Sequence, residues 1–228
     1  MRKCLSGATL KHIAIITMVI DHINKAIIYP RLPSPVPVYL AIMVNLFIVV
    51  GRFAFPLFAF LLVEGFFHTR SRLKYLRNLI FFAVLSEIPF QLCFQTQLGP
   101  SYTENVFFTL TIAFITMWAT EFIRQKTKFW GLAAPFFVIL GSLAATYASC
   151  DYQYLGILVV MLFYYLRGHC LIASIAAFIP LSQTPWTLPA FLATNLYSGQ
   201  RGKQIKWLNY WIYPLHLLVL AFTRFALR

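Results

Sequence analysis

Long uncharged apolar segments alternate with short polar segments along the chain. Such segments approach the ~20 residues that an α-helix needs to cross the hydrocarbon core of a bilayer. The pattern predicts an all-α transmembrane helix bundle of about nine to ten spans, as one domain over residues 1–228. The expected spans are 10–29, 37–67, 74–95, 104–123, 129–148, 153–167, 169–182, 186–199 and 205–226.

The segment 37–67 is too long for one upright helix and too short for two full ones. Splitting it would place the next basic cluster on the opposite side of the membrane, so we expect one tilted or broken span. The shorter segments 153–167 and 186–199 are also compatible with tilted, re-entrant or merged helices. The number of spans therefore stays open by one or two.

The composition supports a membrane location, because 60% of the residues are hydrophobic, 11% are charged and the mean hydropathy is +0.74. A soluble domain of this length could not bury so much apolar surface, which makes the lipid bilayer its expected solvent. The first apolar segment contains Asp21 and His22 and has no small-residue cleavage site, so it reads as a retained helix. The scattered cysteines have no metal-ligand spacing and predict free thiols and no metal.

The formal net charge of +13 is concentrated in clusters. Turns 95–104, 149–153 and 182–187 contain no Lys or Arg, and this alternation is the positive-inside pattern. It predicts a cytoplasmic N-terminus and contact with lipid headgroups. Membrane topology thus explains the excess of basic residues, and we expect no nucleic-acid partner. The side on which Arg224 lies stays open between nine and ten spans. The basic clusters are Arg2, Lys3 and Lys11; Arg70, Arg72, Lys74 and Arg77; Arg124, Lys126 and Lys128; Arg167; and Arg201, Lys203 and Lys206.

Five ionisable residues fall near the middle of four expected spans. A charge at the bilayer centre costs at least ~2.5 kcal/mol, so such residues normally face the bundle interior and one another. Prolines accompany them: Pro56 frees the carbonyl of Arg52, and Pro89 and Pro214 each lie two residues from another of the five. Irregular backbone at this depth indicates a buried polar chamber. The five residues are Asp21, His22, Arg52, Glu87 and His216.

Simpler structural roles compete with a functional site at these positions. Residues four apart on a helix can form ordinary ion pairs, and a charged pair between helices can serve stability alone. The pairs open to this interpretation are Asp21 with Lys25, Glu64 with His68, and Arg52 with Glu87.

Several strings, spread over nearly the whole chain, closely resemble the signature of the TraX family. The longest is GRFAFPLFAFLLVEGF at 51–66, and the others are IDHI at 20–23, SEIPF at 86–90, NVFFT at 105–109, LYSG at 196–199 and YPLH at 213–216. The family is named for a conjugative-transfer protein that acetylates the N-terminal amine of pilin, and it is distantly similar to larger membrane acyltransferases. Asn24, Lys25 and Gln153 depart from its usual residues.

The resemblance implies a multi-pass acyltransferase of the bacterial cytoplasmic membrane. It would take an acetyl group from cytoplasmic acetyl-CoA and pass it to an amine or hydroxyl acceptor at the membrane, either a pilin-like peptide N-terminus or an envelope component. Arg70, Arg72, Lys74 and Arg77 are candidates for binding the phosphates of CoA, although membrane topology alone also explains these charges.

The mid-depth residues suit acyl transfer, which needs a base for the attacking amine or hydroxyl. His22 is the candidate base. Asp21 cannot orient it, because neighbours on a helix point apart, so we expect Glu87 to supply the orienting carboxylate. Arg52 is a candidate for stabilising the oxyanion, and His216 for a second donor or an alternative base.

Two other classes of protein remain compatible with the sequence. A proton-coupled transporter would also place Asp, Glu, His and Arg at mid-depth on helices that prolines interrupt, although no paired halves are evident. A non-catalytic partner in pilus or envelope assembly is the third class. The buried charged layer argues against it, because a scaffold gains nothing from burying charges.

Overall fold

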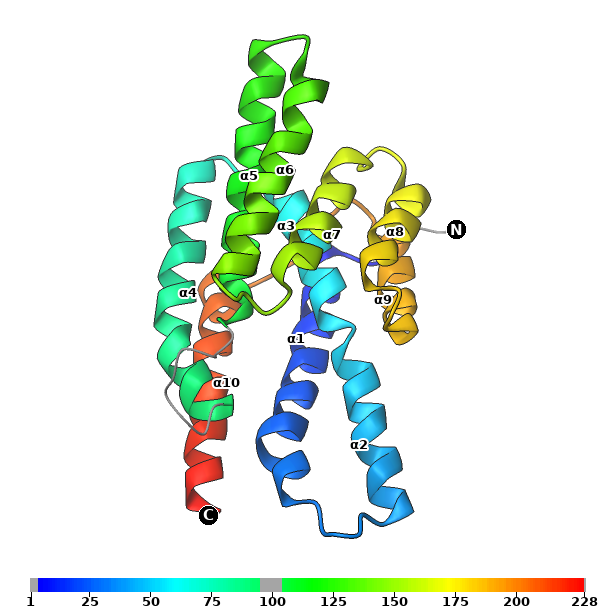
Figure 1. The fold of residues 1–228 in the computed structure, drawn as a ribbon, viewed down its shortest axis with the longest axis vertical. Helices are drawn as coiled ribbons and strands as arrows, with labels where there is room; N and C mark the ends of the chain where they lie inside the picture. The colour runs from blue at the N-terminus through cyan, green and yellow to red at the C-terminus, as the bar shows by residue number, and fades with distance from the viewer. Residues whose placement is uncertain (1–3, 95–103, 228) are drawn as a thin grey trace. The chain divides into compact units, whose positions relative to one another are not determined.

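The computed structural model describes residues 4–94 and 104–227, and these are almost entirely helical (Figure 1). No β-strand occurs among them beyond two isolated bridges, which confirms the all-α class. The helices are α1 (Gly7–Ile23), α2 (Val38–Gly51), α3 (Ala54–His68), α4 (Arg72–Phe94), α5 (Val106–Lys126), α6 (Trp130–Tyr147), α7 (Gln153–Tyr165), α8 (Cys170–Phe178), α9 (Leu188–Ala193) and α10 (Lys206–Ala226). The charges expected at Arg2 and Lys3, and most of the turn 95–104, lie outside the described residues.

Within residues 4–94 and 104–227, five helical segments are long and apolar enough to cross a membrane, so the chain is a multi-pass membrane protein. They are Gly7–Arg31, Val38–His68, Arg72–Phe94, Val106–Lys126 and Trp130–Tyr147, and two shorter apolar helices follow at Gln153–Tyr165 and Cys170–Leu181. The total of nine to ten crossings stays a prediction.

The span expected at 186–199 is wrong as a single crossing helix. This region contains a six-residue α-helix, α9, between two three-residue 3-10 turns. At ~1.5 Å per residue α9 is much shorter than a ~30 Å hydrocarbon core. Pro185 and Pro189 lack the N–H groups that would extend a regular helix backwards.

The segment predicted as one tilted or broken span is indeed broken. Helix α2 ends at Gly51, α3 begins at Ala54, and Arg52 and Phe53 form a turn between them. Pro56 causes the interruption, because it has no N–H to donate to the carbonyl of Arg52, while its own place in the first turn of α3 is well tolerated. The guanidinium of Arg52 is thereby placed at a helix break.

The chain divides into two compact units. Unit 1 comprises Met1–Phe58, Leu85–Pro100 and Thr184–Arg228, and unit 2 comprises Ala59–Val84 and Ser101–Gln183. Helices α3 and α4 each continue from one unit into the other. The expectation of a single domain over the whole chain stays a prediction.

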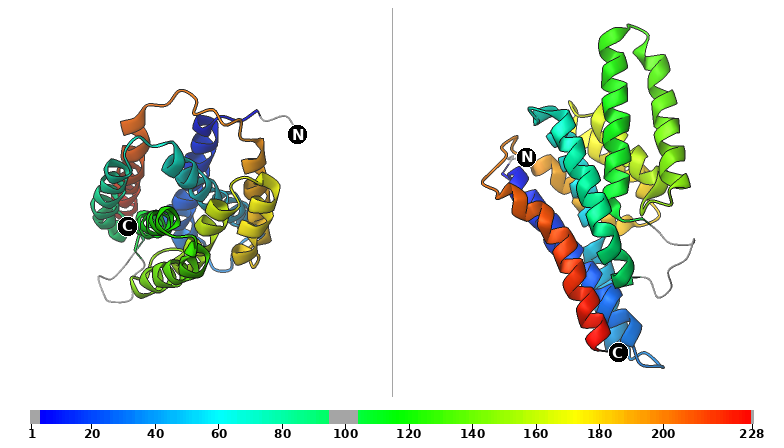
Figure 2. Two further views of the ribbon diagram at one scale, coloured as in Figure 1. Left: turned by 90° about the horizontal axis from the view of Figure 1, so that it is seen from above. Right: turned by 90° about the vertical axis from the view of Figure 1, so that its left-hand side faces the viewer.

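In unit 1, α1 packs against α2 and α10 (Figure 2). At its start, the Gly7 and Ala8 N–H groups donate to the carbonyls of Gln200 and Arg201, both at 2.8 Å, just before α10 begins. Beyond its far end, Arg31 Nη2 donates to the carbonyl of Arg224, 3.2 Å away in the last turn of α10. Helices α1 and α10 therefore run parallel, and the start of α1 and the end of α10 lie at opposite ends of unit 1.

In unit 2, α5 and α6 form an antiparallel hairpin, and α7 packs against both (Figure 1). The hairpin is close-packed at Gly141, where an added Cβ would lie 2.2 Å from Thr116 Oγ1. Helix α6 turns a row of large apolar side chains outward, including Leu132, which is 82% exposed, as well as Phe136 and Leu143. Such a surface is typical of a lipid-facing helix.

Candidate functional site

Two half-buried histidines meet inside unit 1. His22 of α1 and His216 of α10 lie 194 positions apart in the chain, yet His22 Nδ1 and His216 Nε2 are 2.8 Å apart. Their rings are nearly parallel, at 11° and 5.1 Å between centroids. Phe94, at the end of α4, presents an edge contact to His22 at 5.0 Å, and Tyr213 completes the aromatic surroundings at 6.2 Å. The structure thus brings together the two imidazoles that the sequence singled out.

The hydrogen bonds of the pair determine which ring nitrogen carries each proton. His216 Nδ1 lies 2.8 Å from the carbonyl of Ile212, and a carbonyl only accepts, so this nitrogen donates. In the neutral ring His216 Nε2 is then the acceptor, and His22 Nδ1 must donate to it. Neutral His22 therefore keeps the unprotonated lone pair on Nε2. That atom has the electronic state that a general base requires.

Asp21 precedes His22 and is 7% exposed. Its Oδ2 pairs with Lys25 Nζ at 2.6 Å, which confirms the expected ion pair along the helix. Its Oδ1 is buried and has no hydrogen-bond partner among the described residues. The carboxylate is pressed against Gly51, where an added Cβ would lie 2.3 Å from Asp21 Cβ. This packing places Asp21 beside the break between α2 and α3.

The backbone after Asp21 is itself irregular. Residues Asn24–Ile28 form a π-helical turn, a feature that often occurs at functional sites. Asn24 is buried in this turn and donates weakly to the carbonyl of Val44, 3.4 Å away. Its Oδ1 lacks a partner within the described part of the chain.

Arg52 and Glu87 do not form the interhelical salt bridge considered from the sequence. No ion pair joins them, and across residues 4–94 and 104–227 no hydrogen bond reaches the half-buried guanidinium of Arg52. Glu87 instead accepts a hydrogen bond from Gln91, one turn along α4. The predicted orienting role of Glu87 is corrected as well, because the partner of His22 Nδ1 is His216.

The predicted phosphate-binding cluster belongs to unit 2, at the turn between α3 and α4. Arg70, Lys74 and Arg77 are exposed, and the guanidinium of Arg72 lies 4.2 Å from the centre of the Phe66 ring. No ion pair with an acidic side chain occurs at any of the four in the described chain. These cations are therefore electrostatically available to an anion.

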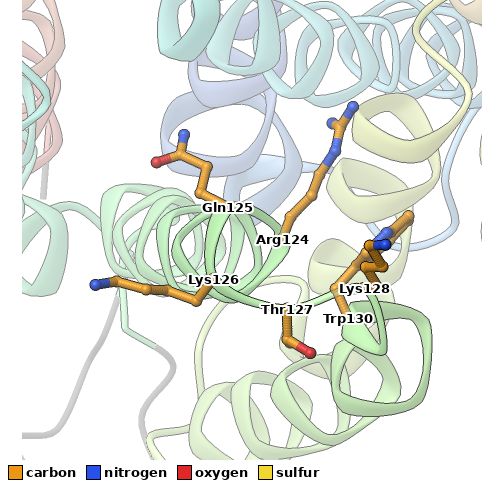
Figure 3. Close-up of a pocket in the computed structure, with 6 residues that line it drawn as sticks. All are labelled: Arg124, Gln125, Lys126, Thr127, Lys128 and Trp130. Atoms are coloured by element: carbon orange, nitrogen blue, oxygen red, sulfur yellow. The ribbon is translucent and has the colours of Figure 1, made fainter.

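A shallow pocket of about 380 Å³ lies at the turn between α5 and α6. Figure 3 shows that its side chains fan out from the end of α5 and do not converge on one point. Arg124 lies 3.5 Å from Glu121 on its own helix, which further reduces its availability to a ligand. The geometry does not favour this pocket as a binding site. Its lining residues are Arg124, Gln125, Lys126, Thr127, Lys128 and Trp130.

The sequence missed the principal partner of Glu64. Arg167, 103 positions away, donates from Nε to Oε1 at 2.7 Å and from Nη2 to Oε2 at 3.2 Å. The expected partner His68 lies 3.7 Å from the carboxylate, and its Nδ1 bonds the Glu64 carbonyl at 2.8 Å. No local spacing could have identified Arg167, since the two residues meet only through packing of unit 2.

All four cysteines are free, as the sequence predicted. Cys4 and Cys170 are exposed, whereas Cys93 and Cys150 are buried. Burial raises the pKa of the Cys150 thiol to about 11, and the neighbouring Glu104 carboxylate shifts it in the same direction. A buried thiol with a raised pKa is a poor candidate for a nucleophile.

The fold and the site define a polytopic helical membrane protein with paired histidines on two of its helices. The family model described as TraX protein matches residues 6–224, so the chain belongs to the TraX family. It is 30% identical over 212 residues to the probable fimbrial assembly protein FimC, serogroup H1, of Dichelobacter nodosus, covering 78% of this chain and 83% of that protein. No solved structure matches it.

Proposed function

We propose that this protein is an integral membrane acyltransferase that transfers an acetyl group from cytoplasmic acetyl-CoA to an amine or hydroxyl of an acceptor at the membrane. The observation that carries the proposal is the hydrogen-bond chain from His22 Nδ1 through His216 to the carbonyl of Ile212. This chain leaves Nε2 of His22 as the basic atom of the pair. The role parallels the oriented histidine of other acyl-transfer sites, with an imidazole in place of the orienting carboxylate.

The reaction needs one proton transfer and one exchange of bonds at the acyl carbon. As the acceptor nitrogen or oxygen attacks the thioester carbonyl, its proton passes to Nε2 of His22. The new carbon–nitrogen or carbon–oxygen bond forms, the carbon–sulfur bond breaks, and the departing CoA sulfur takes the proton back from His22. The protein needs no further oxidant or metal for this balance.

Arg52 is the proposed partner of the negative charge that develops on the carbonyl oxygen. A half-buried guanidinium without an ion pair can donate to an oxyanion without first losing another bond. Its position at the helix break, next to the glycine that packs against Asp21, supports this role. We expect Asp21 to act indirectly, by holding Lys25 and the backbone of the break in place.

The proposed orientation places the N-terminus in the bacterial cytoplasm. Basic residues then gather at the cytoplasmic surface, where Arg70, Arg72, Lys74 and Arg77 are assigned to the phosphates of CoA. The acceptor is proposed to be a peptide N-terminus of a pilin-like subunit or another envelope component. The fimbrial assembly role in the name of the Dichelobacter nodosus relative and the TraX membership support this class of acceptor.

The proposal is tested by release of free CoA thiol from acetyl-CoA by the detergent-purified protein, with and without a peptide that has a free N-terminal amine. The His22→Gln and Arg52→Gln variants should lose turnover while remaining folded. His12→Gln is the matched control, because His12 lies on the same helix with an exposed side chain. Absence of acetyl-CoA binding by wild type, together with substrate-dependent proton flux in vesicles, would replace the proposal with the transporter alternative.

A further inference from the structure

Two arginines connect the ends of the three segments that surround the histidine pair. Arg31, after the π-helical turn, donates from Nη1 to the carbonyl of Ile27 at 2.8 Å and from Nη2 to the carbonyl of Arg224 at 3.2 Å. Arg224, in the last turn of α10, donates from Nη1 to the carbonyl of Cys93 at 2.5 Å. A chain of guanidinium–carbonyl bonds thus runs from the α1 segment to α10 and on to α4.

These bonds have a clear physical reason. The last four carbonyls of a helix have no partner within it, and inside a membrane protein an unsatisfied carbonyl costs several kcal/mol. Arg224 and Cys93 both lie in the last turn of their helices, α10 and α4. Cations are also favoured there by the helix dipole. Each arginine therefore caps a helix that is not its own and fixes the position of that helix end.

The ends of α4 and α10 that these arginines hold belong to the helices whose residues contact His22. Cys93 is followed by Phe94, whose ring makes the edge contact with His22 at 5.0 Å. Arg224 lies eight residues, or ~12 Å, beyond His216 on α10, and arginine side chains on helices point back toward the N-terminus. One side chain thus restrains both the helix of His216 and the aromatic group against His22.

We infer that Arg224 is a positioning residue for the histidine pair. It holds the end of α4 so that Phe94 stays against His22 and keeps the ring in contact with His216. Arg31 supports it by holding the end of α10. The role in positioning stands on the geometry of unit 1, and its consequence for turnover rests on the proposed acyltransferase function.

The primary experiment measures exposure of the pair rather than turnover. Purified protein is treated with diethylpyrocarbonate, and modification of His22 is followed by mass spectrometry for wild type, Arg224→Gln and Arg224→Lys. We expect Arg224→Gln to raise the modification rate roughly tenfold, the equivalent of losing one charge-assisted hydrogen bond. Lysine keeps a cationic donor, so Arg224→Lys should restore most of the protection. Arg201→Gln, which removes an exposed guanidinium from the same unit, is the control and should match wild type.

A double-mutant cycle tests whether Arg224 acts through Phe94. Phe94→Leu keeps an apolar side chain at the end of α4 but removes the aromatic edge, and by itself it should also raise the modification rate. If Arg224 acts through Phe94, the double variant is no more reactive than the stronger single variant. If Arg224→Gln does not fold, Arg31→Gln removes the bond that holds the end of α10 and should also raise the modification rate of His22, and a folded Arg31→Gln variant with the wild-type rate would count against the positioning role.

The outcomes separate this inference from the proposed function. Equal modification rates in wild type and folded Arg224→Gln, or fully additive effects in the cycle, would overturn the positioning role. A protected histidine pair in a protein that never releases CoA would instead leave the positioning role in place and remove the acyltransferase. If the positioning role and the acyltransferase function are both correct, Arg224→Gln should lower kcat with little change in the KM for acetyl-CoA.

Discussion

The two units differ in how the oxygens of their buried and half-buried acids are paired. In unit 2, Glu64 is 8% exposed and both of its oxygens bind Arg167, while Glu121 accepts from the Tyr164 hydroxyl at 2.5 Å and lies beside Arg124. In unit 1, Asp21 keeps one oxygen without a partner among the described residues. Acids paired in this way serve structure, whereas a buried carboxylate oxygen without a partner at membrane depth is a candidate place for a ligand or reaction. The comparison of the acids therefore supports unit 1 as the region of the proposed chemistry.

The sharpest test of this assignment is the histidine pair. His22→Ala should lower the rate of acetyl transfer by roughly 10³-fold, the range expected for loss of a general base. His216→Ala leaves His22 in place but removes the acceptor that fixes its tautomer. We therefore expect a smaller loss of rate, roughly tenfold. Both variants should unfold at nearly the wild-type temperature. Equal turnover in wild type and His22→Ala would remove unit 1 as the reactive region.

Gly51 tests the packing beneath the helix break. Gly51→Ala would force the new Cβ into Asp21 and should lower the free energy of unfolding by ~1–3 kcal/mol, the cost of overpacking. Thermal unfolding in detergent measures this change. Gly131→Ala is the matched control: nothing lies within 4 Å of its added Cβ, so it should be neutral or slightly stabilising. A stable Gly51→Ala variant with full activity would contradict the close packing of Asp21.

The Glu64–Arg167 pair tests the structural half of the comparison. Glu64→Gln and Arg167→Gln should each destabilise the protein, with a coupling energy of ~1–2 kcal/mol between them in a double-mutant cycle. Arg167 is partly exposed, so the coupling energy should be lower than that of a fully buried pair. Turnover per folded molecule should stay near that of wild type. Loss of turnover without loss of stability would assign chemistry to unit 2 as well.

The basic turn between α3 and α4 should affect donor affinity rather than chemistry. Exposed ion pairs contribute ~0.2–1 kcal/mol each, so replacing Arg70, Lys74 and Arg77 together by Gln should raise the KM for acetyl-CoA roughly fivefold with kcat little changed. Added salt should weaken the binding of acetyl-CoA by wild type, so that its KM approaches that of the triple variant. Lys126→Gln with Lys128→Gln is the control for loss of charge elsewhere in unit 2. An unchanged KM in the triple variant would leave topology as the sole role of this cluster.

The smallest perturbation tests the direction of α1 and α10. Cys4 is exposed before α1, and Leu227 is exposed after α10, so Leu227→Cys in a Cys4→Ser background provides a second label site. Such surface changes should alter stability by less than ~0.5 kcal/mol. Both proteins also carry Cys170→Ser, because that thiol is exposed as well. A membrane-impermeant maleimide should label the cysteine at 227 of the Cys4→Ser, Leu227→Cys variant in intact cells, and should label Cys4 of the protein with Leu227 only after permeabilisation. Labelling of both from one side would contradict an odd number of crossings.

Local patterns in the sequence predicted the long helices and drew attention to His22 and His216. Apolar run length predicted the long spans, and the length of 37–67 with Pro56 predicted a broken segment, because both depend on bilayer thickness and backbone hydrogen bonds. The same reasoning failed at 186–199, where prolines divide an apolar region into short turns. Depth along the helices also selected His22 and His216.

Only the tertiary structure decided which of these residues meet. It paired His22 with His216 rather than with Glu87, left the guanidinium of Arg52 unpaired among the described residues, and joined Glu64 to Arg167. It also showed that α1 and α10 run parallel. The physical reason is that helix formation and membrane insertion depend on neighbouring residues, whereas contacts across 194 positions depend on how helices pack and on which polar groups satisfy one another.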